Sequence, residues 1–180
     1  ISKRDLHILC VARLVHEKGV EDLLEAFLLL SRKHKNIHLT FVGNGPLKTD
    51  LFGFKNIHVK QVSYGQMIRE YHHADIFCLP SRSSETWEEQ YGMVLVEAMA
   101  CGLPIVTTTT GAIPEVCDNV ALYTQPTSPP GLAASLEILL NDEKLRDRLG
   151  KAGRQRALHH FDRLKISEKI NAVYQNLLKH

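Results

Sequence analysis

The feature that most constrains the fold is an alternation of short apolar runs with amphipathic stretches along most of the chain. Each apolar run is bounded by glycine, proline or polar residues, as expected of a strand that is buried on both faces. The stretches between the runs carry apolar residues at helical spacing, and MVLVEAMACG ends at Gly102, the residue type that commonly follows a helix. Strands are therefore expected at residues 6–12, 37–43, 56–62, 74–80, 103–108 and 120–125.

This alternation predicts an α/β fold, a doubly wound, Rossmann-like parallel sheet with helices on both faces. Helices are expected at residues 19–35 and 66–73, with short ones after the Gly-Pro turn of VGNGP and after Ile113. Residues 130–180 contain three helical segments and no strand pattern. The prolines within residues 124–131 mark the end of the sheet portion, as a hinge inside one domain.

Composition and charge exclude several classes of function. The chain has 180 residues, of which 44% are hydrophobic, enough for one well-packed core. Its net charge of +2 comes from interspersed acids and bases, so nucleic acid is not expected as a partner. No segment approaches the ~20 apolar residues that span a bilayer, and no secretory signal pattern is present. Four separated cysteines without metal-ligand spacing are expected as reduced structural thiols of a cytoplasmic protein: Cys10, Cys78, Cys101 and Cys117.

The loops at the carboxyl ends of the predicted strands form the candidate ligand site, because ligands of doubly wound sheets bind in the crevice at that edge. The first loop, ARLVHEKG, holds Arg13 and Lys18 just before a helix that begins near Gly19. A guanidinium, an ammonium and helix-terminal amides together favour an anion such as a pyrophosphate. An ordinary solvated loop is the alternative, and His16 and Glu17 are interpreted as surface residues.

The second loop, VGNGP, places Gly43 and Gly45 directly after a strand. Their missing side chains allow close backbone approach to a ligand, although a plain tight turn explains them equally well. The spacing is not the GxGxxG of dinucleotide-binding proteins, so a nicotinamide-dependent dehydrogenase is disfavoured.

Two glutamates flank the start of the helix predicted at MVLVEAMA. Glu89 lies just before this helix, and Glu97 lies more than one turn inside it on an otherwise apolar stretch. Carboxylates on either side of the free amides from Gly92 to Val94 suit a ligand with hydroxyls at both ends and phosphates between them, which is the layout of a nucleotide sugar. A pair of ordinary helix charges is the alternative. The same loop holds three residues that we interpret as structural: Glu85, Trp87 and Glu88.

At these residues the sequence resembles the family 4 (group 1) glycosyltransferases, retaining enzymes of the two-domain GT-B fold. The signature E-x-[FY]-G-x4-E is matched by Glu89, Tyr91, Gly92 and Glu97, preceded by ADIFCLPS and followed by AMACGLPIV. ARLVHEKG, VGNGP and GAIPEV complete an ordered set that spans residues 12–116. The resemblance implies that residues 1–180 are a C-terminal nucleotide-sugar-binding domain, with the N-terminal acceptor domain outside this chain. The segment 162–180 resembles the helix that crosses back to that N-terminal domain.

The resemblance also implies a role for each matching position. Arg13 and Lys18 would neutralise the donor diphosphate and would form the catalytic set together with Glu89, which would hold the donor sugar. Glu97 would accept hydrogen bonds from the ribose hydroxyls. The other donor-binding positions that it implies are Gly43, Gly45, Val62, Tyr91, Gly92, Met93 and Val94.

The reaction implied by the resemblance is transfer of a sugar from a nucleoside diphosphate to an acceptor hydroxyl, without a metal or other cofactor. UDP-glucose or another UDP-hexose is the expected donor, and a polysaccharide or glycolipid precursor is the expected acceptor. GDP-mannose is the alternative donor. Lys60 and Tyr64 depart from the family pattern near the expected base site, so the resemblance does not specify the base. A non-catalytic nucleotide-sugar-binding module is the alternative class. The complete enzyme is expected in the cytoplasm or at the inner face of the cell membrane, and the isolated domain is expected to be inactive.

Overall fold

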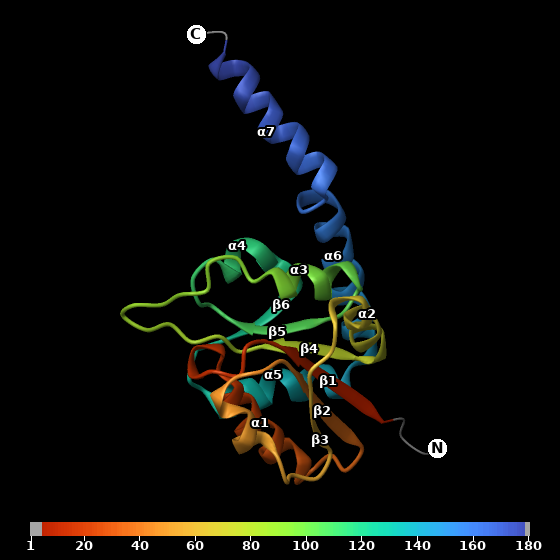
Figure 1. Cartoon of the computed structure of the whole chain (residues 1–180). Helices are drawn as coiled ribbons and strands as arrows, with labels where there is room; N and C mark the ends of the chain where they lie inside the picture. Colours follow the sequence, from red (N-terminus) through yellow and green to blue (C-terminus); the bar gives the residue numbers. More distant parts are fainter. Residues whose placement is uncertain (1–4, 179–180) are drawn as a thin grey trace.

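The structure, a computed structural model, describes residues 5–178. Its centre is a six-stranded parallel sheet with the order β3-β2-β1-β4-β5-β6 (Figure 1). The strands are β1 (Leu6–Val11), β2 (Ile37–Val42), β3 (Ile57–Lys60), β4 (Ile76–Leu79), β5 (Ile105–Thr108) and β6 (Ala121–Thr124). The predicted α/β parallel fold is thus confirmed, with each strand slightly shorter than its apolar run in the sequence.

The chain builds the sheet outward from its middle in both directions. It runs from β1 through β2 to the edge strand β3, returns to place β4 on the other side of β1, and then continues through β5 to β6. Ile8 of β1 accordingly pairs with Leu39 of β2 and with Ile76 of β4. The boundary between β1 and β4 is the topological switch point, where ligands of this fold class bind.

Helices cover both faces of the sheet. One face packs against α1 (Val20–Ser31) and α5 (Pro129–Asn141). The other face packs against α2 (Tyr64–His73), α3 (Met93–Ala100), α4 (Ile113–Cys117) and α6 (Glu143–His160). Three short 3-10 helices complete these layers: η1 (His16–Lys18), η2 (Pro46–Leu51) and η3 (Asp118–Val120).

The central strands are apolar on both faces because both faces are covered. On β1, Ile8 and Cys10 belong to the core beneath α1 and α5, whereas Leu9 and Val11 belong to the core beneath α3 and α6. All four side chains are buried. This two-sided burial explains why the strand reads as a continuous apolar run without a polar alternation.

Helix α2 begins at Tyr64, two residues before the predicted start at Gln66. The backbone N–H of Ser63 donates a hydrogen bond of 3.2 Å to the side-chain oxygen of Gln66, an arrangement that caps the helix. Gln66 is therefore the third residue of the helix. The helix starts two residues earlier than predicted because Gln66 caps it from the third position and is not its first residue.

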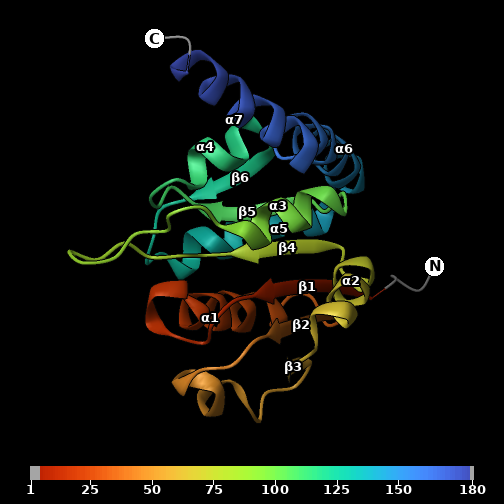
Figure 2. The same cartoon turned by 45° about the horizontal axis from the view of Figure 1, so that its top comes forward.

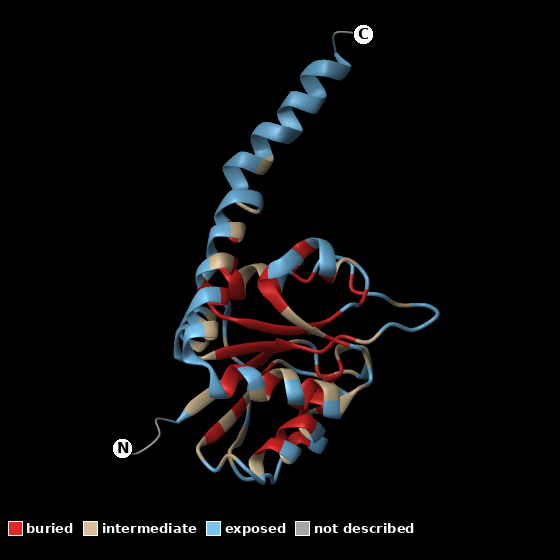
Figure 3. Ribbon diagram, turned by 180° about the vertical axis from the view of Figure 1, so that it is seen from behind, coloured by how far each residue is buried: buried red, intermediate tan, exposed pale blue. Residues whose placement is uncertain are grey.

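The last helix, α7 (Arg163–Leu177), projects away from the domain, has no buried residue and is exposed over most of its length (Figure 3). Ile170, Val173, Tyr174 and Leu177 are spaced as one helical face, and each is more than half exposed. The predicted end of this segment at residue 180 lies outside the described residues. Among residues 5–178, no helix has the length and apolar character needed to cross a membrane.

Three histidines stack across the amino half of the sheet. The His7 ring lies 4.9 Å from that of His38, and the His38 ring lies 6.1 Å from that of His58. Burial and the neighbouring His38 lower the pKa of His7, while Asp75 and Asp5 oppose this shift. The folded protein therefore binds a proton at His7 less readily than the unfolded chain.

We predict that this stack makes stability depend on pH. Because the pKa of His7 is lower in the folded state than its unfolded value of about 6.5, the histidine is neutral in both states at higher pH and stability is then greatest. As the pH falls below about 6.5, the unfolded chain binds the proton more readily than the folded protein, and stability is lost. Denaturant midpoints measured between pH 7.5 and 5.5 should therefore fall less steeply for His7→Gln than for the unaltered chain. His159→Gln, at an exposed position of α6, is the control and should behave like the unaltered chain. Equal slopes for all three proteins would contradict the prediction.

Candidate functional site

The loops that follow the strands gather at the carboxyl edge of the sheet, on the left in Figure 2. The segment of residues 80–92, between β4 and α3, extends furthest from the sheet. The segment between β1 and α1 contains η1 and lies on the other side of the switch point. The residues predicted as the catalytic set lie on these two segments.

Lys18 and Glu89 form an ion pair between these two segments. The Lys18 Nζ lies 2.5 Å from Glu89 Oε2, and only 15% and 9% of the two side chains are exposed. The positions are 71 residues apart in the chain. A carboxylate as buried as this one requires a charged or hydrogen-bonding partner, and Lys18 supplies it. Both residues were expected in one crevice, but the sequence did not predict their contact.

Gly19 allows Lys18 to approach the end of β4. This residue has a φ of 63°, and a Cβ built on it would lie 2.0 Å from the carbonyl oxygen of Pro80. No larger residue fits without displacing the backbone of one segment. Gly19 therefore ends η1 and starts α1 while the two segments remain in contact.

Glu89 is also held by hydroxyl and backbone groups. Ser81 Oγ donates a hydrogen bond of 3.0 Å to Glu89 Oε2, and the Ser81 side chain is fully buried. The backbone N–H of Ala112 donates to the carbonyl oxygen of Glu89 over 2.8 Å. Both the side chain and the main chain of Glu89 are therefore positioned by protein groups.

Two further residues contact the candidate site: Trp87, which the sequence led us to interpret as structural, and Arg82, which no sequence motif singled out. The Trp87 ring lies 4.7 Å from Lys18 Nζ, which is the geometry of a cation–π contact. Arg82 forms hydrogen bonds of 2.6 and 2.7 Å with the carboxylate of Asp22, and this contact raises the pKa of Arg82. The Arg82–Asp22 ion pair holds the start of the loop of residues 80–92 against α1. Neither contact has a spacing signal, because the partners come from distant parts of the sequence.

Glu97 lies on α3 and is partly buried. The hydroxyl of Tyr71, on α2, donates a hydrogen bond of 2.6 Å to Glu97 Oε2. Burial and this hydrogen bond raise the pKa of Tyr71 far above its usual range, so the tyrosine stays a donor. The contact accounts for a carboxylate on an otherwise apolar helix, and no described residue donates a hydrogen bond to the other carboxylate oxygen of Glu97.

Arg13 differs from Lys18 in being exposed. Its guanidinium forms no hydrogen bond or ion pair within the described part of the chain. The neighbouring Leu14 is fully buried and anchors this loop to the core. Within residues 5–178, Arg13 is therefore a cation without a hydrogen-bonding or ion-pair partner, on the same loop that carries Lys18.

Gly43 and Gly45 pack against the first loop. A Cβ on Gly43 would lie 1.8 Å from the carbonyl oxygen of Ala12, and a Cβ on Gly45 would lie 2.3 Å from that of Leu14. The backbone N–H of Leu14 donates to the carbonyl of Asn44 over 2.9 Å. The absence of side chains is thus needed for contact between two loops of this chain, and a contact with ligand at Gly43 and Gly45 stays a prediction.

The remaining predicted contacts lie around the start of α3 and the end of β3. Gly92 has a φ of 69° and precedes the helix, whose first amides lack partners within the helix. Tyr91 and Met93 are exposed, whereas Val94 and, beyond β3, Val62 are partly buried. The Tyr91 ring meets Phe161 edge-on at 6.1 Å, so this region also touches the end of α6.

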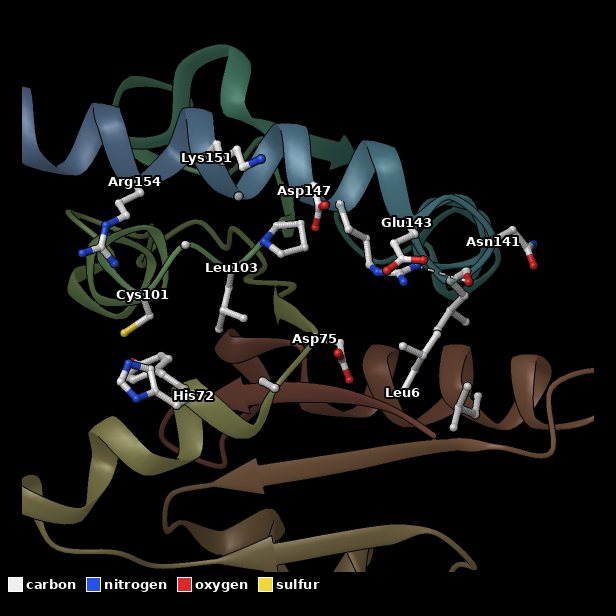
Figure 4. Close-up of a pocket in the computed structure, with 18 of the residues that line it drawn as sticks. Leu6, His72, Asp75, Cys101, Leu103, Asn141, Glu143, Asp147, Lys151 and Arg154 are labelled. Carbon is white, nitrogen blue, oxygen red and sulfur yellow. Dashed lines mark hydrogen bonds between the residues drawn. The ribbon is translucent and has the colours of Figure 1, made fainter. Parts of the chain in front are cut away.

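A cavity of about 680 Å³ lies away from these residues, near the amino ends of the strands (Figure 4). Its walls include Asp75, Cys101, Asp147 and Arg154, and none of the predicted site residues lines it. Burial raises the pKa of the Cys101 thiol. The buried thiols of Cys10 and Cys117 have pKa values raised to about 12, so they pack as apolar groups.

Comparison with known proteins gives the family. The family model described as "Glycosyl transferases group 1" matches residues 1–156. The capsular polysaccharide biosynthesis glycosyltransferase CapM of Staphylococcus aureus is 30% identical over 180 residues, covering 94% of this chain and 46% of CapM. A GDP-mannose-dependent monoacylated alpha-(1-6)-phosphatidylinositol monomannoside mannosyltransferase of Corynebacterium glutamicum is 29% identical, covering 94% of this chain and 47% of that protein.

A solved structure gives the same result for the fold. Sucrose-phosphate synthase of Thermosynechococcus elongatus superposes with a TM-score of 0.82 at 24% identity, covering 97% of this chain and 46% of that one. The fold and the ordered loops therefore define a domain of GT-B glycosyltransferases. The chain belongs to the group 1 glycosyltransferase family, and it spans about half the length of the relatives that it matches.

We predict that loss of Lys18 destabilises the protein because it leaves Glu89 buried without its counterion. Lys18→Met should lower the free energy of unfolding by about 3 kcal/mol, and Lys18→Met with Glu89→Leu by less, when measured by denaturant unfolding. The control is Lys60→Met, which breaks the more exposed Lys60–Glu70 pair and should cost less than about 1 kcal/mol. Equal costs at the two lysines would contradict the assignment of a buried pair.

Proposed function

We propose that this chain is the donor-binding, C-terminal half of a retaining glycosyltransferase and that its ligand is a nucleoside-diphosphate hexose. The observation that supports this proposal most is the contact of Lys18 with Glu89 at the switch point of the sheet. The contact places a carboxylate that can accept hydrogen bonds from sugar hydroxyls next to an ammonium group that can bind phosphate. A nucleotide sugar presents those two groups side by side.

The diphosphate would be bound by Arg13, Lys18 and the first amides of α3. As the glycosidic bond breaks, negative charge develops on the leaving diphosphate, and fixed positive groups stabilise that charge. The Lys18 ammonium carries three donors, so it can serve a phosphate oxygen while it remains bonded to Glu89. Arg13 is exposed and supplies the second cation. These cations would make a metal ion unnecessary for the reaction.

The two carboxylates would bind the two ends of the donor. Glu89 would accept hydrogen bonds from the transferred hexose, and Glu97, already bonded to Tyr71, would accept them from the ribose. Main-chain groups of Tyr91, Gly92, Met93 and Val94 would contact the sugar and the distal phosphate. Val62 would contact the base through its main chain at the end of β3.

A second, N-terminal domain would supply the acceptor site. The chain spans about half of each matched relative, and the exposed apolar face of α7 is suited to packing against further protein. The acceptor would be a glycan or glycolipid that the complete enzyme reaches in the cytoplasm or at the inner face of the membrane. Gly43 and Gly45 lie on a loop that would face that domain.

UDP-glucose is the donor that we propose first, as a representative of the UDP-hexoses. GDP-mannose is the second candidate, because one relative at 29% identity is a GDP-mannose-dependent mannosyltransferase. The two donors differ in both base and sugar. Binding measurements with the free nucleotides separate the choice of base from the choice of sugar.

We predict selective binding of one nucleotide in calorimetric titrations with UDP, GDP, ADP and their hexose conjugates. Arg13→Ala should weaken this binding about tenfold, since it removes charge-assisted hydrogen bonds to phosphate without removing a hydrogen bond or ion pair among residues 5–178. Lys33→Ala, at an exposed position beyond α1, is the charge-matched control and should leave binding unchanged. Adding EDTA should also have no effect. Binding that requires a divalent cation, or that ignores Arg13, would contradict the proposal.

We also predict that this chain alone transfers little or no sugar, because the acceptor site lies on the other domain. Turnover should be measured with each donor that binds, by following release of the free nucleoside diphosphate in the presence of sugar and lipid acceptors. Robust transfer by the chain alone would contradict the two-domain assignment.

A further inference from the structure

Three buried hydroxyl groups link the end of β5 to the Glu89 carboxylate. Thr108 Oγ1 and Thr110 Oγ1 donate hydrogen bonds of 2.5 and 2.8 Å to the carbonyl oxygen of Ser81. Ser81 Oγ in turn donates to Glu89 Oε2 over 3.0 Å. Ser81, Thr108 and Thr110 are each at most 1% exposed. A buried hydroxyl is costly unless it is bonded, and here each hydroxyl is used to hold the next group.

We propose that Ser81 is a positioning residue that selects which oxygen of Glu89 meets the donor sugar. This inference rests on the proposed function, in which Glu89 binds the transferred hexose. The Ser81 hydroxyl would act only through Glu89 and would not touch the nucleotide.

The geometry at Glu89 supports this role because both partners bind the same oxygen. Lys18 Nζ and Ser81 Oγ each donate to Oε2, and none of the described residues donates to Oε1. Two donors on one oxygen fix the rotation of the carboxylate about its last side-chain bond. Oε1 is left as the acceptor for a ligand hydroxyl.

The backbone of Glu89 is held by the same loop that holds Ser81. Gly111 has a φ of 53°, and a Cβ on it would lie 2.2 Å from the carbonyl oxygen of Glu89. The N–H of the next residue, Ala112, donates to that oxygen over 2.8 Å. Residues just beyond β5 therefore set the main chain of Glu89 directly and its carboxylate through Ser81.

A positioning role predicts an effect on the sugar and not on the nucleotide. Loss of the Ser81 hydroxyl leaves Glu89 paired with Lys18 but removes the second donor that orients its carboxylate. Affinity for the nucleoside diphosphate depends on Arg13, Lys18 and backbone amides, and it should be preserved. Affinity for the hexose conjugate should fall, since only the conjugate carries the hydroxyls that Oε1 would bind.

The experiment compares calorimetric affinities of the selected nucleotide and its hexose conjugate for three single variants. Ser81→Ala should lower the affinity for the conjugate relative to the nucleotide by about five- to tenfold, the net effect of one typical hydrogen bond. Thr108→Val, which removes one donor to the Ser81 carbonyl, should lower the same ratio by a smaller factor.

Thr107→Val is the matched control, because Thr107 is equally buried but its hydroxyl donates to the carbonyl oxygen of Leu79 and not to Ser81. It should lower the thermal unfolding temperature without changing the ratio. An unchanged ratio in Ser81→Ala, or an equal fall in Thr107→Val, would overturn the positioning role while the nucleotide still binds. Absence of binding by the unaltered chain to every nucleotide and conjugate would instead contradict the proposed function, and the role of Ser81 with it.

Discussion

The ion pair of Lys18 with Glu89 is the interaction on which the arrangement of the carboxyl edge depends. Both side chains are largely buried, and either charge would be destabilising without the other. The ion pair therefore fixes the positions of the two segments that carry Lys18 and Glu89. Lys18 follows β1 and Glu89 follows β4, so the pair spans the switch point of the sheet. Ser81 and Trp87 complete the surroundings of the two charges.

Close backbone packing brings these segments near enough for the pair to form. Gly19 lies against the carbonyl of Pro80, Gly43 against that of Ala12, and Gly111 against that of Glu89. At each position a side chain would collide with backbone, so a larger residue would displace one of the two segments. These three glycines are therefore needed for packing between segments of the protein, whether or not they also contact a ligand.

The site combines groups that are fixed before any ligand arrives with groups that are free. Glu89, Lys18 and Glu97 are held by protein partners, whereas the Arg13 guanidinium and the backbone N–H groups of Met93 and Val94 form no hydrogen bond within residues 5–178. Fixed acceptors for hydroxyl groups, together with unpaired donors for phosphate, suit the proposed nucleotide sugar. Preorganised groups of this kind stabilise developing charge without first having to reorganise.

The sequence by itself determined the sheet, its parallel direction and the loops that carry the site. Apolar runs such as residues 37–43 and the glycine after α3 reflect local burial and local backbone geometry, which a sequence pattern records directly. The start of α2 was misplaced by two residues because Gln66 caps the helix through its side chain. Arg13, Lys18, Glu89 and Glu97 were predicted as site residues from their loop positions and charges, and the resemblance to a family then implied a role for each.

Only the tertiary structure decided which of these residues touch. The contacts of Lys18 with Glu89 and Trp87, of Tyr71 with Glu97, and of Ser81 with Glu89 join different segments of the fold. Their geometry depends on how the loops after neighbouring strands pack against each other. No periodicity in the chain encodes that packing, because it arises from side-chain shape and charge at positions far apart in the sequence.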